Sequence, residues 1–273
     1  MSSITQGTVI SGVRSEKYNG INCCAIIINA RCDLAQGKTN KIYYLVAMSL
    51  EEWLFSSIGI STIYIGKIND LGKKIQQKTE SEGLCWNDLQ SFSPSDFNIV
   101  IDYTGLSDKE KKSIKDDFSQ FYLLKSDDLS VDKKREIIKN NKKIANNFFS
   151  EMSNGKNSNY LILPSNAFKK RTFQNSIIVD LKELDYFDTK QKEALLKYEI
   201  DNKNIRLSES DKNIFNEKFF VLDDPGYAMV IDEVDSPWIE YIVQHFANAF
   251  TRIGVNNISK EQIEVTINTI IDN

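Results

Sequence analysis

The chain has 273 residues, of which 41% are hydrophobic and 26% are charged, and its 34 Lys and Arg residues face 38 Asp and Glu residues for a net charge of −4. This composition is typical of a folded chain and argues against intrinsic disorder, and the length suffices for one large domain or two smaller ones. The small negative charge excludes a strong overall attraction to nucleic acid or to an anionic membrane, although a local basic patch remains open.

Membrane and secretion signals are absent from the early part of the sequence. The longest apolar run there, from Cys23 to Ile28, is too short to span a bilayer, and no charged-then-apolar leader precedes it. We therefore expect no membrane partner and a cytoplasmic location. The cysteines at 23, 24, 32 and 85 form no metal-like spacing, so we expect buried thiols. The scarcity of proline, with only four, is typical of an AT-rich bacterial genome.

The first fifty residues predict three strands, at Thr8–Val13, Cys23–Ala30 and Lys41–Met48. The turn-forming stretches Tyr18-Asn19-Gly20 and Gln36-Gly37-Lys38 separate them. The middle run is apolar at nearly every position, as in a strand that is covered on both faces. The opening unit is therefore predicted to be a small antiparallel meander.

A mixed stretch follows the meander. Ser49 is suited to cap a helix, with Glu52 completing a capping box. We then expect a strand at Ile60–Ile65, a helix at Ile68–Glu80 and a strand at Phe97–Tyr103.

The most polar helical stretch runs from Ser107 to Lys125 and then from Val131 to about Met152, which predicts two central helices, arranged as a hairpin. The segment Ser153–Ser158 is rich in Ser, Asn and Gly and is the best candidate for a domain boundary. We expect either an N-terminal domain at 1–153 and a C-terminal domain at 159–273, or a single domain.

The remaining elements are mixed strands closed by two helices. Strands are predicted at Tyr160–Leu163 and Ser176–Leu181, a helix at Thr189–Glu199, a hairpin at Lys218–Leu222 and Tyr227–Val234 around Asp224-Pro225-Gly226, a helix capped by Ser236 with Pro237 first and Gly254 as its stop, and a last helix from Ser259. Because strands and helices do not alternate regularly, the predicted fold class is α+β.

The first candidate site is the end of the second strand. Arg31, Cys32, Asp33 and Lys38 follow a buried strand and enter a turn, which is a common way to hold polar side chains on a rigid element. Arg31 is suited to bind phosphate or carboxylate, Asp33 to act as a base, and Lys38 to add a charge. The simpler interpretation, which we favour, is that Arg31 pairs with an acid, Cys32 packs inside, and Asp33 caps the turn.

The second candidate site is one face of the helix predicted from Pro237 to Ile253. Trp238, Tyr241, His245 and Arg252 lie beside an apolar stripe at helical spacing, and an aromatic face with an arginine is a common recognition surface. His245 is the single histidine, so histidine chemistry must run through it, although a lone histidine on a helix is more often structural.

Other chemistry is weakly indicated. Cys32 and His245 form a thiol nucleophile and base only if the fold brings them together. An acidic cluster is suited to Mg²⁺, but turns and helix starts also collect acids, so we expect no metal and no cofactor; it comprises Asp223, Asp224, Asp232, Glu233 and Asp235. Nucleotide-loop and hydrolase signatures are missing. Nucleic acid stays a secondary partner because of three basic runs, Lys133-Lys134-Arg135, Lys142-Lys143 and Lys169-Lys170-Arg171.

Two passages carry a resemblance. A strand that ends in Cys32-Asp33-Leu34, and a Ser236-Pro237-led helix that ends in Arg252-Ile253-Gly254, resemble a group of uncharacterised bacterial proteins. The resemblance implies a setting in defence or mobile loci and no particular chemistry.

The opening meander also resembles the small SH3-like barrel of the MazF and PemK ribonuclease toxins. This chain is much longer than those toxins and lacks their Arg-Pro pair before the second strand. The resemblance implies a nuclease that acts through the strand end from Arg31 to Lys38.

These observations leave three functional hypotheses. The leading one is a non-enzymatic binding or regulatory protein, a subunit of a bacterial defence or stress complex whose partner is another protein. The second is a nuclease or other phosphodiester enzyme at Arg31, Asp33 and Lys38. The third is a cysteine-dependent hydrolase at Cys32.

Overall fold

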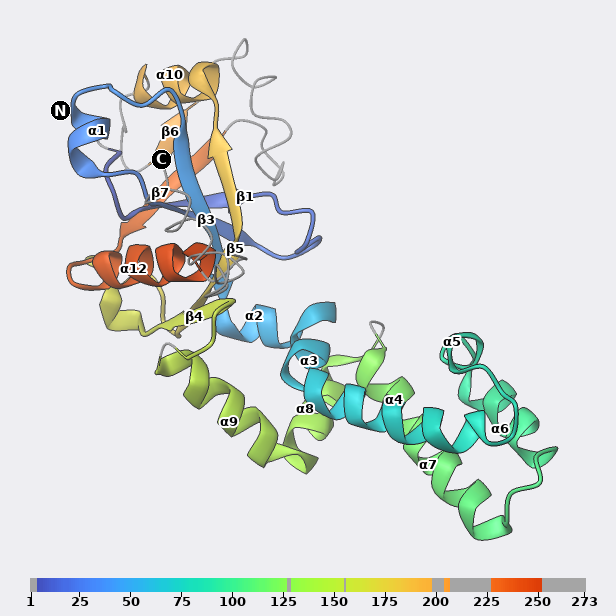
Figure 1. The fold of residues 1–273 in the computed structure, drawn as a ribbon. Helices are drawn as coiled ribbons and strands as arrows, with labels where there is room; N and C mark the ends of the chain where they lie inside the picture. The colour runs from blue at the N-terminus through green and yellow to red at the C-terminus, as the bar shows by residue number, and fades with distance from the viewer. Residues whose placement is uncertain (1–3, 127–128, 155, 198–203, 207–226, 252–273) are drawn as a thin grey trace, which may run out of the picture. The chain divides into compact units, whose positions relative to one another are not determined.

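The computed structural model describes residues 4–126, 129–154, 156–197, 204–206 and 227–251 (Figure 1). The chain forms two compact units, each of which is described by itself. The sheet unit comprises residues 1–15, 22–48 and 152–273, and the helical unit comprises residues 16–21 and 49–151.

The sheet unit contains a seven-stranded sheet in the order β4-β5-β3-β2-β1-β7-β6. The strands are β1 Thr8–Val13, β2 Cys23–Ile27, β3 Ile42–Ser49, β4 Tyr160–Leu163, β5 Ile177–Phe187, β6 Asn204–Arg206 and β7 Tyr227–Glu233. The pairs β1–β2, β2–β3, β1–β7, β4–β5 and β6–β7 are antiparallel. The predicted α+β class and the predicted N-terminal meander are confirmed.

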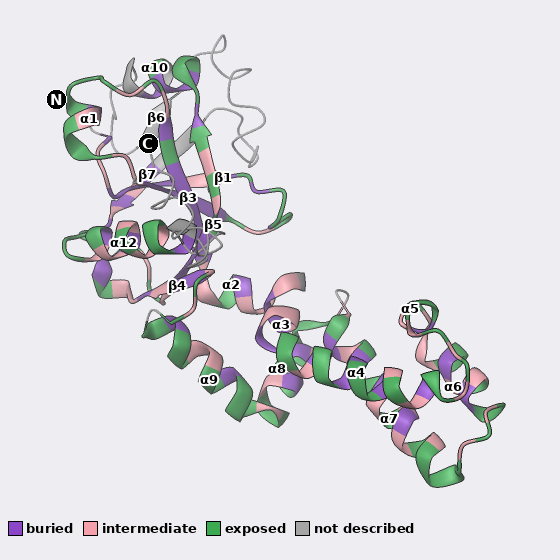
Figure 2. Ribbon diagram, viewed as in Figure 1, coloured by how far each residue is buried: buried purple, intermediate pink, exposed green. Residues whose placement is uncertain are grey.

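The meander occupies the centre of this sheet, so it does not form an SH3-like barrel of its own. All five residues of β2 are buried, as its continuous apolar run predicts for a strand covered on both faces. The neighbouring β3 is likewise buried at six of its eight residues (Figure 2). Strands from the second half of the chain extend the meander on both sides. These later strands are the physical reason why the three N-terminal strands stay open.

Helices cover the sheet. They are α1 Arg31–Ala35, the 3-10 helix η1 Ser165–Ala167, α10 Thr189–Lys197 and α12 Trp238–Thr251. Ile239 and Ile242 of α12 are fully buried in one hydrophobic core with residues of five strands, among them Val9, Leu45 and Val179. The apolar stripe predicted on this helix is therefore a core-facing stripe.

The start of α12 differs from the prediction. The helix begins at Trp238, whose N–H donates to the Asp235 carbonyl at 2.8 Å, and Ser236 and Pro237 form a turn before it. Arg252, Gly254 and the last helix predicted from Ser259 lie outside the described residues, as do Lys218–Leu222 and the Asp224-Pro225-Gly226 turn.

The helical unit is formed by eight described helices. They are α2 Leu50–Leu54, α3 Ser57–Ile63, α4 Ile65–Glu80, α5 Trp86–Leu89, α6 Pro94–Asp102, α7 Asp108–Lys125, α8 Val131–Asn140 and α9 Lys142–Ser153. The cap predicted at Ser49 is confirmed, and a second cap, which was not predicted, begins α7. Ser49 Oγ accepts from the Glu52 N–H at 3.0 Å, and Ser107 and Glu110 form a capping box at the start of α7.

Two predicted strands in this unit are wrong. Ile60–Ile65 lies mainly in α3, and Phe97–Tyr103 lies mainly in α6. Both helices have strong N-terminal signals, because Ser56 accepts from two backbone N–H groups, and Ser93 caps a helix that begins with Pro94. These caps outweigh the β-propensity of the isoleucines and aromatic residues that follow.

The compact units are divided differently from the expected 1–153 and 159–273 domains. The predicted boundary segment Ser153–Ser158 does adjoin a junction, since the helical unit ends at Glu151. However, strands β1–β3 share one sheet with β4–β7. The helical unit is therefore an insertion, in the sequence, between β3 and β4.

Candidate functional site

The loop between β2 and β3, residues 29–41, carries the first predicted site, and one side chain ties its two ends together. The Asn29 side-chain Nδ2 donates to the Lys41 backbone carbonyl at 3.0 Å, and the Asn29 side-chain Oδ1 accepts from the Tyr43 N–H. The Asn29 side chain therefore forms hydrogen bonds with the backbone of β3 and its preceding residue, at the point where the loop interrupts the pairing of β2 with β3. The loop leaves the sheet with a fixed geometry.

Helix α10 holds the far side of the same loop. The ammonium of Lys192, a nearly buried residue, donates to the Thr39 carbonyl, and the Thr189 hydroxyl donates to the Asn40 carbonyl at 3.1 Å. The helix itself is capped, since Asp188 and Gln191 exchange side-chain to backbone hydrogen bonds at 2.9 and 3.0 Å. The loop is thus fixed to a rigid element.

Helix α1 lies between β2 and the predicted turn; it ends at Ala35, and Gln36 and Gly37, which has φ of +64°, form the turn. Arg31, Cys32 and Lys38 are exposed and Asp33 is half-buried, so the expectation that Cys32 packs inside is wrong. Cys32 stays exposed because the short helix turns only Leu34 into the core. Cys85 is likewise exposed, whereas Cys23 and Cys24 are buried as expected.

An exposed aromatic pair lies beside this loop. Tyr43 of β3 and Tyr186 of β5 are 38% and 37% exposed, and their ring centroids lie 5.9 Å apart. The Lys41 ammonium lies 3.6 Å from the Tyr186 ring centroid, which is a close cation–π contact. Leu184, two residues before Tyr186, is 37% exposed. We call Arg31, Lys38, Lys41, Tyr43 and Tyr186 the tyrosine surface.

Neighbouring side chains fix the strands that carry the two tyrosines. The buried Tyr44 hydroxyl donates to Asp185 at 2.9 Å, and the Ser15 hydroxyl donates to Glu183 at 2.9 Å. Burial raises the pKa of Tyr44, and the Asp185 carboxylate raises it further. Tyr44 is therefore a neutral donor that sets the alignment of β3 with β5. Side chains alternate along a strand, so Tyr43 and Tyr186 point away from this pair.

The sequence missed Tyr43 and Tyr186 as site residues. The strand was predicted to end at Leu181, although β5 continues to Phe187. The alternation of Lys182, Leu184 and Tyr186 with Glu183 and Asp185 gave no clear apolar face. Only the pairing of β5 with β3 brings Tyr186 beside the loop.

The second predicted site is a half-buried row on α12. The ring centroids of Trp238 and Tyr241 lie 6.1 Å apart, and those of Tyr241 and His245 lie 4.3 Å apart. Trp238 and Tyr241 also pack against the core of the sheet unit. Much of this aromatic surface is therefore used in the fold, and Arg252, its predicted fourth member, lies outside the described residues.

Within the described part of the chain, the Cys32 thiol and the His245 imidazole do not form the nucleophile–base pair that a cysteine hydrolase requires. There, the hydrogen-bond partner of the Cys32 thiol is Asp33 Oδ1, at 3.7 Å. His245 contacts Tyr241 instead.

Asp232, from the predicted acidic cluster, anchors a basic loop. Its fully buried carboxylate accepts from the N–H groups of Lys170, Thr172 and Glu233 at 2.8 to 2.9 Å. Burial alone would raise the pKa of Asp232, but these hydrogen bonds outweigh burial and hold the pKa below its ordinary value. Arg171, between the anchored residues, has φ of +52°. Asp232 is thus a structural anion, and no metal-binding group of three or more acidic, histidine or cysteine residues occurs within the described ranges. Asp223 and Asp224 lie outside those ranges.

The basic run from Lys133 to Arg135 does not form one exposed patch. The ammonium of Lys134 is turned inward and donates to the carbonyls of Phe55 and Ser56 at 2.7 and 3.1 Å, and Lys133 pairs with Glu136. A buried lysine at the carboxyl end of α2 satisfies carbonyl groups that the helix leaves open. The run therefore stabilises the helical unit.

No known protein family, no curated protein and no solved structure matches this chain. Within the described ranges, no helix combines the length and the apolar character that a membrane crossing requires. The function must therefore be argued from the residues themselves.

Proposed function

We propose that this chain is a non-enzymatic binding protein, that the tyrosine surface is its binding surface, and that its partner is a single-stranded nucleic acid. The observation that carries the proposal is the exposed Tyr43–Tyr186 pair with Lys41 over one ring. Aromatic rings on a basic surface are the usual platform for unpaired bases, because bases stack on the rings while cations contact the phosphates.

The charge around the pair supports an anionic partner. Arg31, Lys38 and Lys41 lie in one short loop in which Asp33 is the single acid. The loop is held at both ends by Asn29 and α10, so little conformational entropy would be lost on binding. Because the whole chain carries a net charge of −4, the attraction is local and should be strongly salt-dependent.

Binding is favoured over cleavage at this surface. Asp33 is half-buried, and its neighbours at the loop are cations and a thiol rather than a second carboxylate or a histidine. A nuclease site at Arg31, Asp33 and Lys38 would therefore rely on a single carboxylate, without a second carboxylate or a histidine at the loop to act with it. The assignment to a defence or stress complex, and a protein partner at α12, stay predictions.

The test is fluorescence anisotropy with labelled single-stranded RNA and DNA of about ten nucleotides, at low and high salt. We expect binding that weakens as salt rises, and about tenfold weaker binding for Tyr186→Ala and for Tyr43→Ala. Tyr103→Ala is the matched control, because Tyr103 is 88% exposed in the helical unit. It should bind like the unchanged chain.

Two results would overturn the proposal. Absence of binding at low salt would show that single-stranded nucleic acid is not the partner. Equal binding by Tyr186→Ala, Tyr43→Ala and Tyr103→Ala would show that the tyrosine surface is not the binding surface. The same oligonucleotides should be checked on a denaturing gel. Cleavage that is lost in Asp33→Ala would replace the binding proposal by the nuclease hypothesis.

A further inference from the structure

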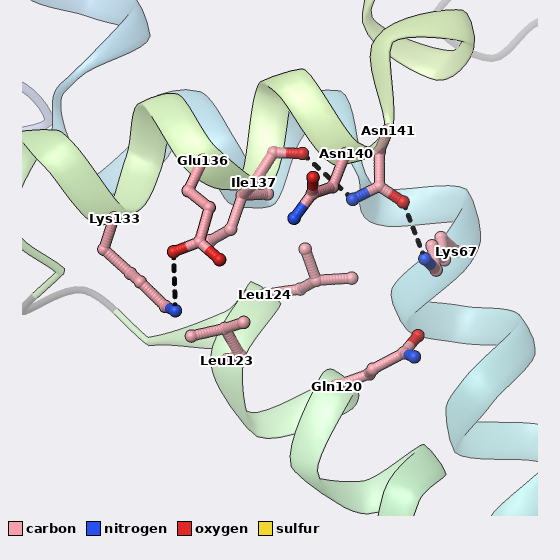
Figure 3. A pocket seen from close by; sticks show the side chains of 9 residues that line it. All are labelled: Lys67, Gln120, Leu123, Leu124, Lys133, Glu136, Ile137, Asn140 and Asn141. Carbon is pink, nitrogen blue, oxygen red and sulfur yellow. Dashed lines mark hydrogen bonds and ion pairs between the residues drawn. The ribbon is translucent and has the colours of Figure 1, made fainter.

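The helical unit contains a pocket of about 280 Å³, which lies between α7 and α8 and is bordered by α4 (Figure 3). It is independent of the tyrosine surface, because all of its lining residues belong to the helical unit. Pockets for small ligands generally begin at about 300 Å³, so this volume suits a ligand much smaller than a nucleotide.

One side of the pocket is aliphatic. Leu124 of α7 and Ile137 of α8 are each 3% exposed, and Leu123 extends the same wall. The three side chains face the pocket because α7 and α8 turn these positions toward each other (Figure 3). An aliphatic wall without aromatic rings favours a flat apolar face of a ligand and offers it no hydrogen bond.

Two primary amides provide the polar groups. Gln120 comes from α7 and Asn140 from α8, and both side chains extend into the pocket (Figure 3). Both residues are exposed to solvent, and within the described residues neither amide is held by a hydrogen bond to the protein, so both can turn toward a ligand at the open side of the pocket. A primary amide presents a donor and an acceptor side by side, which matches the edge of a cyclic amide or an aminopyrimidine.

The charge of the pocket rim is nearly balanced. Lys133 pairs with Glu136 at 2.8 Å. The Lys67 ammonium donates to the side-chain Oδ1 of Asn141 at 2.8 Å, and the side-chain Nδ2 of Asn141 donates to the Ile137 backbone carbonyl at 2.9 Å (Figure 3). Asn141 thereby fixes the Lys67 ammonium, which has further donors to offer. A neutral ligand with a carbonyl oxygen fits this rim better than a free ion.

We propose that this pocket binds a free nucleobase or a heterocycle of the same size and hydrogen-bonding pattern. The flat ring would lie against the half-buried Leu123, over the buried Leu124 and Ile137, and the amides of Gln120 and Asn140 would bind its donor and acceptor edge. Lys67 would donate to an exocyclic carbonyl oxygen, which favours uracil or hypoxanthine over adenine.

The experiment is a titration of the full chain with uracil, hypoxanthine, cytosine and adenine up to about 10 mM, followed by calorimetry and by the side-chain amide signals in nitrogen-15 NMR spectra. We expect saturable binding of uracil or hypoxanthine and shifts of the Gln120 and Asn140 amide signals. Asn140→Leu keeps the branched shape of the side chain, Gln120→Leu shortens it by one carbon, and both remove hydrogen bonds, so each should weaken binding about tenfold.

The matched control is Asn147→Leu, which changes an exposed asparagine of α9 outside the pocket and should leave binding unchanged. Circular dichroism checks that each variant is folded. If a leucine variant does not fold, Asn140→Asp tests the same contact, because it keeps the shape and removes the amide donor. Absence of heat and of amide shifts with all four bases, or binding that is equal in the Asn140 variants and Asn147→Leu, would overturn the proposal.

Discussion

The local structure of the two units is specified by contacts of different range, although longer contacts, such as Lys134 to Phe55, also stabilise the helical unit. In the sheet unit, buried polar side chains join residues far apart in the sequence, as Tyr44 and Asp185, 141 residues apart, and Ser15 and Glu183, 168 residues apart, show. In the helical unit, the caps act over two or three residues, as at Ser56 and Ser107. Local sequence therefore specifies the helices directly, whereas the loops of the sheet unit depend on strands that are distant in the chain.

The largest expected effect tests how strongly one close contact determines the stability of the helical unit. A Cβ atom on Gly59 would lie 2.3 Å from the Trp53 carbonyl oxygen and 2.6 Å from that of Leu54, so Gly59→Ala forces α3 away from α2. We expect a loss of about 4 kcal/mol in the free energy of unfolding, measured by urea denaturation. Gly66→Ala is the control, because nothing lies within 4 Å of its Cβ atom, and it should be neutral or stabilising by about 0.5 kcal/mol. Equal effects would contradict the packing at Gly59.

The next effect tests the long-range anchor of the sheet unit. Asp232→Asn replaces one acceptor oxygen by a donor that faces a backbone N–H, and we expect a loss of about 2 to 3 kcal/mol. Because the pKa of Asp232 is lowered in the fold, its carboxylate stabilises the protein above the unfolded pKa, and this stabilisation is lost as the pH falls through the folded pKa. The difference between the two proteins should therefore shrink below about pH 4. Asp235→Asn, at an exposed residue, should change little; an equal loss would contradict the anchor.

A smaller effect tests the alignment of β3 with β5. Tyr44→Phe removes the hydrogen bond to Asp185 and should cost about 1 to 2 kcal/mol. The raised pKa of Tyr44 keeps its hydroxyl neutral, so this stabilisation is complete below about pH 10 and declines as the pH rises further. In an ultraviolet titration, Tyr44→Phe should remove one tyrosine from the group that ionises only on unfolding, because Tyr44 is one of the buried tyrosines. Titration of Tyr44 with the exposed tyrosines would contradict the buried hydrogen bond.

The smallest effect concerns a single cap. Ser107 Oγ and the Ser107 N–H both contact the Glu110 carboxylate, and these bonds hold the pKa of Glu110 below its ordinary value. Ser107→Ala should cost about 1 kcal/mol in the helical unit. Hydrogen exchange should increase in the first turn of α7 and stay unchanged in β1–β3. Increased exchange across the sheet would show that the two units are less separate in stability than their contact ranges indicate.

The accuracy of the sequence predictions follows the same division. Apolar periodicity located α4, α7 and α12, and runs of β-branched, aromatic and other apolar residues located β1 to β3. The errors at Ile60–Ile65 and Phe97–Tyr103 arose because β-branched and aromatic residues were given more weight than the serine caps before them.

The candidate site was only half accessible to sequence reasoning. The charged residues Arg31 and Lys38 could be found because they follow a strand in one short segment. Tyr186 could not be found in this way. It lies beside Lys41 only because β5 pairs with β3, and these two strands are more than a hundred residues apart in the sequence. Gln120 and Asn140 likewise line one pocket only because α7 and α8 both border it.

The insertion of the helical unit between β3 and β4 has a consequence for synthesis on the ribosome. Strands β1–β3 emerge first, but their neighbours β5 and β7 follow only after residues 49–151 have been made. The helical unit, with its short-range contacts, can fold during that interval, whereas the meander waits with both of its edges unpaired. A nascent chain stopped before β4 should therefore be the form of this protein most prone to aggregate.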